Sequence, residues 1–277
     1  MLNINNHSRD SAGLTYVYPV VSRRAEGVSV GINLNINNAC NWACVYCQVP
    51  NLKRGGPPPV DLGRLADELR TFLKDATTGD FMTHRVPPEA RRLVDIAFSG
   101  NGEPTSAGEF AGAVQVVEGV MQEFELLETL KLRLITNGSL LHREGVRKGI
   151  SRIGKMNGEV WFKLDRATEF GIDKVNGVKM KPERLEASLM QCAELAPTWI
   201  QTCYFAFDGL EPDKTEQSAY LQFIASAKSK IRGVHLYGLA RPSLQADAQR
   251  FSSVSPEYFL IFANKIAALG VKVITTP

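Results

Sequence analysis

The sequence predicts an α/β protein with a partial (β/α)6-type parallel barrel in a single domain, and three observations predict it. From Val28 to Ile274, apolar stretches of strand length alternate with helical stretches. Strands separated by helices of roughly 10–20 residues need parallel, right-handed crossovers. Polar residues follow several of these strands, and a chain of 277 residues lies within the range of one α/β barrel.

The expected helices and strands follow from the helix-breaking residues and the spacing of apolar residues along the chain. The first strand, 28–36, is apolar and leads into a cysteine-rich segment. The helix-breaking run 55–59 precedes Asp61, which is expected to cap a helix over 62–73 with apolar residues at helical spacing. Further strands are expected at 93–98, 130–135, 159–164, 199–207, 234–239 and 271–274, with helices at 110–127, 142–156, 182–195, 216–231 and 256–269. We expect residues 1–27 to form an N-terminal extension and 28–277 the barrel domain.

Composition bounds the class of protein. The chain is 44% hydrophobic and 22% charged, which is typical of a globular protein with a large core. A net charge of +3 permits an anionic substrate or nucleic acid and argues for neither. Five cysteines, three of them crowded together, do not suggest a disulfide framework, so a reducing compartment is expected. With neither a signal-peptide pattern nor a long apolar stretch, the predicted location is cytoplasmic, without membrane contact.

The most specific motif is the CxxxCxxC spacing of Cys40, Cys44 and Cys47, directly after the first strand. Three thiolates can hold three irons of a [4Fe–4S] cluster and leave the fourth iron open to a small molecule. Zinc is the rival metal. Structural zinc sites take four closed ligands, usually with CxxC pairs, and no CxxC pair or nearby histidine occurs here. The spacing therefore favours an iron–sulfur cluster.

Polar residues at five successive strand ends are expected to converge on one opening. Each has an ordinary alternative explanation, such as a turn or an exposed side chain, but all five together indicate a site. The groups are Ser99-Gly-Asn-Gly-Glu-Pro-Thr105, Thr136-Asn-Gly-Ser139, Lys163 with Asp165, Gln201, and the segment 237–243 that contains Arg241.

These residues carry a resemblance to the radical S-adenosylmethionine (SAM) enzymes. The cysteine motif with Tyr46 before its last cysteine is similar to the signature of that superfamily, and Gly100-Asn-Gly-Glu103 resembles its glycine–glutamate motif. The likeness covers roughly 28–274. The segments around Glu103 and Asn137 resemble the branch that contains tRNA wyosine-forming enzymes and uncharacterised bacterial relatives.

The resemblance implies roles for individual residues. The three cysteines would ligate a [4Fe–4S] cluster, whose open iron would bind the amine and carboxylate of SAM. The implied SAM contacts are Tyr46 and Leu239 at the adenine, Gly100, Asn101, Gly102 and Glu103 at the methionine amine, and Asn137, Ser139 and Lys163 at the ribose or carboxylate. Candidate residues on the substrate side are Gln201, Cys203 and Arg241.

The resemblance also implies an activity. One electron, from a donor such as flavodoxin or ferredoxin, would cleave SAM to methionine and a 5′-deoxyadenosyl radical that abstracts hydrogen from an unidentified substrate, either a small molecule or tRNA. The cofactor performs this chemistry while the protein fixes geometry and excludes water. A tRNA-base-modifying enzyme, a glycyl-radical-activating enzyme and a non-catalytic iron–sulfur redox protein are the alternatives.

Other features have ordinary explanations. Cys192 and Cys203 are most simply buried apolar residues, although Cys203 has a second explanation as a group that acts on substrate. The helix expected at 142–156 is basic and has the charge to guide an RNA backbone, or it is simply a solvated face. Trp42 is expected to shield the cluster, to contact an electron donor, or only to pack.

Overall fold

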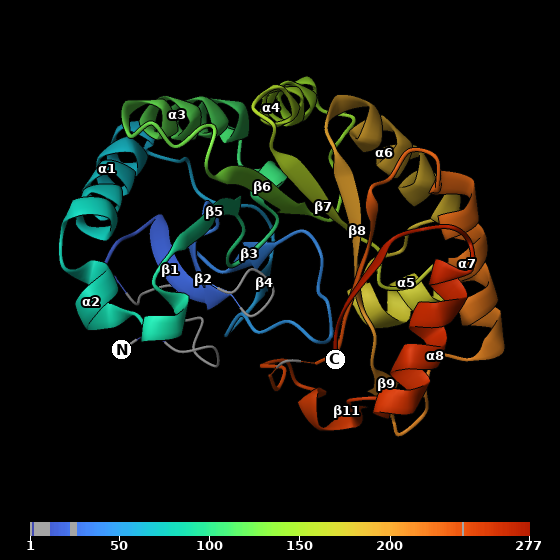
Figure 1. Cartoon of the computed structure of the whole chain (residues 1–277). Coiled ribbons are helices and arrows are strands. Elements are labelled where there is room, and N and C mark those ends of the chain that lie inside the picture. The colour runs from blue at the N-terminus through green and yellow to red at the C-terminus, as the bar shows by residue number, and fades with distance from the viewer. Residues whose placement is uncertain (1, 3–11, 23–26, 240) are drawn as a thin grey trace.

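The computed structural model describes residues 2, 12–22, 27–239 and 241–277. A curved sheet forms its centre, and helices cover the outer face of the sheet as an arc (Figure 1). The sheet has eight strands in the order β1-β2-β5-β6-β7-β8-β10-β12. Their bounds are Val17–Ser22, Gly27–Ile32, Leu93–Phe98, Lys131–Thr136, Glu159–Lys163, Thr198–Cys203, Gly233–Tyr237 and Val273–Thr276. The predicted single-domain partial barrel is confirmed.

The helices connect these strands in the expected alternation. They are α1 (Leu62–Thr78), α2 (Phe81–Arg85), α3 (Phe110–Glu123), α4 (Glu144–Lys155), α5 (Glu169–Asn176), α6 (Pro182–Leu195), α7 (Lys214–Ala227) and α8 (Pro256–Ala267). Asp61 caps α1 as predicted, because its side chain accepts a hydrogen bond from the Arg64 amide at 2.9 Å. Two short pairs lie outside the main sheet: β3 (Ala39–Cys40) with β4 (Lys53–Arg54), and β9 (Ala206–Phe207) with β11 (Phe251–Ser252).

The two faces of the sheet differ in chemistry because side chains alternate along each strand. Leu132 and Leu134 of β6 are fully buried in the hydrophobic core toward the helices. The alternate residues of β6, Arg133 and Ile135, line a cavity on the inner face instead. The inner face therefore lines a cavity with both polar and apolar side chains, and the apolar core lies between sheet and helices.

The structure adds elements that the sequence did not indicate. Strand β1 falls within the predicted N-terminal extension and pairs antiparallel with β2, so part of that segment belongs to the sheet. Much of 1–27 lies outside the described residues, and the domain boundary stays a prediction. No helix is expected between 164 and 182, yet α5 lies there. The expected strand 199–207 is two strands, β8 and β9.

Strands β2, β5, β6, β7, β8, β10 and β12 are all parallel. Their carboxyl ends consequently share one rim, which is where binding sites form in such sheets.

Candidate functional site

The cysteine segment follows β2 and lies over the cavity. Cys40, Cys44 and Cys47 are half-buried free thiols, and all three line a cavity of about 340 Å³. A turn joins the last two, since the Cys47 amide donates to the Cys44 carbonyl at 3.0 Å. Burial raises the pKa of Cys40 to about 11 and that of Cys44 to about 12. A bound metal would favour the thiolates that burial disfavours.

Contacts from distant parts of the chain hold this cysteine segment. The amides of Ala43 and Val45 donate to the last carbonyls of helix α5, at 3.0 and 2.9 Å. The Gln245 side chain donates to the Cys47 carbonyl at 3.0 Å, and the Ser243 hydroxyl donates to that of Val45 at 2.6 Å. The geometry of the three thiols is therefore fixed by the fold around them.

The described residues contain no group of three His, Cys, Asp or Glu side chains close enough to hold a single metal ion. A cluster that gives each thiolate its own iron needs ligands spaced farther apart than one ion does. Structural zinc sites, in turn, have four ligands around one ion.

The glycine-rich segment after β5 packs tightly against the cysteine segment. A Cβ on Gly102 would lie 2.1 Å from the Ala39 carbonyl oxygen, so only glycine fits at this position. The Asn33 side-chain oxygen accepts the Asn101 amide at 3.0 Å. The two segments that the sequence assigns to cluster and SAM are therefore in direct contact.

Glu103 is 3% exposed and bridges two strand ends. Its carboxylate accepts hydrogen bonds from the Thr105 amide and hydroxyl, the Thr136 hydroxyl at 2.7 Å and the Asn137 amide at 2.7 Å. Burial raises the pKa of this carboxyl group, and the hydrogen bonds oppose that effect. In this geometry Glu103 fixes the loop after β6, where Asn137 and Ser139 lie.

A second buried polar group lies beneath the cysteine segment. Asp165 accepts hydrogen bonds from Tyr46 at 2.5 Å, from Asn176 at 2.8 Å and from the Cys203 amide at 2.9 Å. The Lys163 ammonium lies 4.8 Å from the Tyr46 ring centre and 3.2 Å from the Tyr237 hydroxyl. Burial alone would lower the pKa of Lys163, but the Tyr237 and Asp165 groups raise it above its ordinary value.

The structure brings most of the predicted site residues to this one cavity. Besides the cysteines, the predicted residues in its lining are Tyr46, Gly100, Asn101, Gly102, Glu103, Asn137, Lys163, Gln201, Cys203, Leu239 and Arg241. Ser139 is not among the lining residues. Its hydroxyl bonds Asn41 at 2.8 Å and Asn137 at 2.7 Å, so it positions other side chains.

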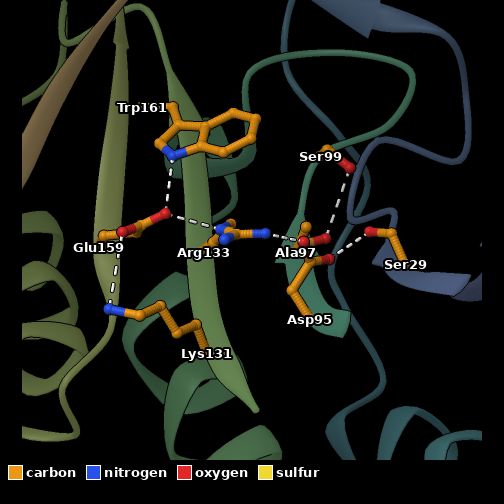
Figure 2. Close-up of polar contacts among 8 residues, drawn as sticks. All are labelled: Ser29, Asp95, Ala97, Ser99, Lys131, Arg133, Glu159 and Trp161. Carbon is orange, nitrogen blue, oxygen red and sulfur yellow. Dashed lines mark hydrogen bonds and ion pairs between the residues drawn. The ribbon is translucent and has the colours of Figure 1, made fainter. Parts of the chain in front are cut away.

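Charged residues that sequence reasoning missed lie on the inner face of the sheet, and two of them, Asp95 and Arg133, line the cavity (Figure 2). Arg133 of β6 forms ion pairs with Asp95 of β5 and with Glu159 of β7, the latter at 2.7 Å. The Trp161 indole N–H donates to Glu159 at 3.0 Å, and the Ser29 hydroxyl donates to Asp95. The sequence did contain a signal for these residues. Side chains alternate between the two faces of a strand, and Asp95 and Arg133 are charged residues at inward-facing positions of otherwise apolar strands.

Burial alone would raise the pKa of Glu159, but the charge and hydrogen bonds of Arg133 hold it below its ordinary value. Asp95 and Glu159 carry two negative charges, and Arg133 together with Lys131, 3.8 Å from Glu159, compensates them. This group of charged side chains therefore adds little net charge to the cavity.

Several basic side chains outside the cavity are paired with carboxylates or carbonyls of the same protein. On the basic helix α4, Lys148 pairs with Glu144 at 2.7 Å, Arg152 pairs with Glu118, and Arg147 donates to the Leu141 and His142 carbonyls. Cys192 is fully buried in the core, as expected for an apolar role. Within the described residues, no helix combines the length and apolar character needed to cross a bilayer.

Sequence comparison finds partial relatives, and no protein-family model matches the chain. A GTPase Obg from Brachyspira hyodysenteriae is 27% identical over 135 residues, which is 48% of this chain and 17% of that protein. UPF0026 protein MJ1312 from Methanocaldococcus jannaschii is 27% identical over 169 residues, 57% of this chain and 46% of that protein. The chain thus matches less than half the length of either relative.

The GTPase name finds no support in the residues of this chain. The GxxxxGK[ST] pattern of P-loop proteins is incomplete, because Gly149, Gly154 and Lys155 are followed by Met156. These three residues also lie inside helix α4, whereas a P-loop connects a strand to a helix.

Solved structures resemble this one over most of its length. TYW1 with a lysine–pyruvate adduct bound has a TM-score of 0.58 and 15% identity, covering 88% of this chain and 74% of that one. A radical SAM methyltransferase from Sphaerobacter thermophilus also has a TM-score of 0.58, with 14% identity, covering 90% and 66%. The protein anSMEcpe with bound AdoMet has a TM-score of 0.51 and 17% identity, covering 88% and 63%. This likeness shows that the chain shares its partial-barrel fold with these structures, one of which is a radical SAM methyltransferase.

Proposed function

We propose that this protein is a radical SAM enzyme with a single [4Fe–4S] cluster. The proposal rests on the convergence of the cysteines and the polar strand ends on one cavity. Three thiols at CxxxCxxC spacing and the polar ends of five strands line one cavity at the carboxyl rim of the sheet. A redox sensor does not need polar strand ends around an open iron. Their presence at the cavity therefore favours an enzyme over a non-catalytic iron–sulfur protein.

The residues present fit the proposed groups. Cys40, Cys44 and Cys47 line one cavity and would hold the cluster through three irons. A cavity of about 340 Å³ is of the size that takes a small molecule. When bound, the cluster and SAM would supply a 5′-deoxyadenosyl radical for hydrogen abstraction.

The protein's own residues would bind and orient SAM. Gly102 lets the backbone after β5 approach the cysteine segment, and Glu103 holds that backbone together with the loop after β6. Tyr46 and Leu239 would flank the adenine. Lys163 would present its ammonium group to the carboxylate or ribose of SAM.

Gln201, Cys203 and Arg241 remain the candidates on the substrate side, because all three line the cavity. A small-molecule substrate is the first candidate. The tRNA alternative loses support from helix α4, where Lys148 and Arg152 are already paired with Glu144 and Glu118. An electron donor such as flavodoxin or ferredoxin and a cytoplasmic location complete the proposal.

Anaerobic reconstitution tests the function directly. The wild-type protein should take up about four irons per chain, and dithionite with SAM should then yield 5′-deoxyadenosine. Cys44→Ala should lose both, whereas Cys192→Ala, which alters a core cysteine, should keep both. Cluster assembly with no SAM cleavage and no effect of SAM on the EPR spectrum would instead favour a redox sensor.

A further inference from the structure

Helix α5 places one buried amide against a predicted cluster ligand. The Asn176 side-chain nitrogen lies 3.3 Å from the Cys44 sulfur and 2.8 Å from Asp165 Oδ2. Asn176 is 2% exposed, so water does not compete for these contacts. An amide nitrogen carries two hydrogens, and this one has an acceptor for each.

The orientation of this amide is determined by its neighbours. A carboxylate only accepts hydrogen bonds, so the nitrogen of Asn176, and not its oxygen, must face Asp165. Asp165 is itself held by the Tyr46 hydroxyl and the Cys203 amide. The second N–H of Asn176 is thereby directed at the Cys44 sulfur.

The backbone of helix α5 fixes the distance. The Asn176 carbonyl accepts the Ala43 amide at 3.0 Å. Gly177 ends the helix in the left-handed conformation, with φ of 62°, and a Cβ there would lie 2.8 Å from the Ala43 oxygen. Helix and cysteine segment are thus in contact at the residue before Cys44.

We infer that Asn176 is a positioning residue that raises the reduction potential of the cluster through its hydrogen bond to the Cys44 sulfur. The inference rests on the proposed function. A hydrogen bond to a ligand sulfur stabilises the reduced cluster, which carries one more negative charge, and such bonds are among the factors that set cluster potentials. Removing the donor makes the cluster harder to reduce and leaves iron binding to the three thiolates.

The test is a potentiometric titration of the anaerobically reconstituted protein, followed by EPR. Asn176→Leu, close in volume and without a donor, should bind about four irons and show a lower midpoint potential than wild type. The expected change is up to tenfold in the reduction equilibrium, about 59 mV for one electron. Asn176→Ser is a second variant in case the leucine variant fails to fold. Its hydroxyl is a smaller donor, and it should lower the midpoint potential by less than leucine does.

Thr202→Val is the matched control. Thr202 is equally buried, and its hydroxyl bonds the Leu164 carbonyl at 2.8 Å and the Tyr220 hydroxyl at 2.6 Å, both of them oxygen partners. Its loss should destabilise the fold without changing the potential. A wild-type potential in both Asn176 variants would overturn the inference while the function stands. Failure of the wild-type protein to assemble the cluster would instead overturn the proposed function, and this inference with it.

Discussion

Arg133 is the residue that holds together the charged group on the inner face of the sheet. Its guanidinium is paired with Asp95 and Glu159, both largely buried. Arg133→Met would leave the buried Asp95 without its cation and Glu159 with only the half-exposed Lys131 at 3.8 Å, and breaking a buried pair in this way typically costs about 3–5 kcal/mol. We expect a loss of that order in the free energy of unfolding, measured with urea at pH 7. Lys148→Met, which breaks an exposed ion pair on α4, should cost less than about 1 kcal/mol.

The same variant predicts a dependence on pH. The folded-state pKa of Glu159 is lowered, so its stabilising contribution is present above its unfolded pKa, about 4.3, and is lost as the pH falls through the folded value. Without Arg133, burial favours the protonated form of Glu159. The stability difference between wild type and Arg133→Met should therefore shrink from pH 7 to pH 4. A difference that stays constant over this range would contradict the assigned role of the ion pairs.

Glu103 offers a separate test of the SAM site. In Glu103→Gln the amide must place its NH2 group against at least one N–H or hydroxyl that the carboxylate now accepts. A buried donor left without an acceptor costs about 1–3 kcal/mol, so the loop after β6 should shift. We expect roughly tenfold weaker SAM binding by calorimetry, with iron content unchanged. Glu144→Gln, an exposed change on α4, is the control, and equal SAM affinity in both variants would refute the role of Glu103.

At the scale of elements, helix α5 connects the barrel to the cysteine segment. Gly177→Ala would introduce a left-handed alanine, which costs roughly 1–2 kcal/mol, and a Cβ within 2.8 Å of the Ala43 oxygen. Gly209→Ala shares the backbone cost, with φ of 73°, but its Cβ would meet nothing within 4 Å. Both variants should lose stability, and only Gly177→Ala should lose iron per chain. Equal iron in the two variants would show that α5 does not position the thiols.

The elements also show what sequence can and cannot predict. The strands of the parallel sheet and helices α1, α3, α4, α6, α7 and α8 follow from runs and periodicity, and the CxxxCxxC motif locates the rim of the cavity. Helix α5 has only eight residues, too few for a periodic signal, although Thr168 caps it and Gly177 ends it. Arg133 was missed for a different reason, since its partners on β5 and β7 are apparent only once the strand order is known.

At the scale of the whole molecule, the proposed cluster would join three segments that are far apart in sequence. Helix α5 contacts the cysteine segment at 43–45, and residues 243–245 contact it at 45–49. A ligand that fixes the thiols lowers the population of open states in every segment that must move with them. Hydrogen exchange of the reconstituted protein, compared with the metal-free protein, should thus show added protection at 40–48, 169–177 and 241–246. Helices α1 and α3, which pack on the far side of the sheet, should exchange alike in both forms. Protection confined to 40–48 would mean that the cysteine segment moves independently, and that the barrel does not hold the thiols in place.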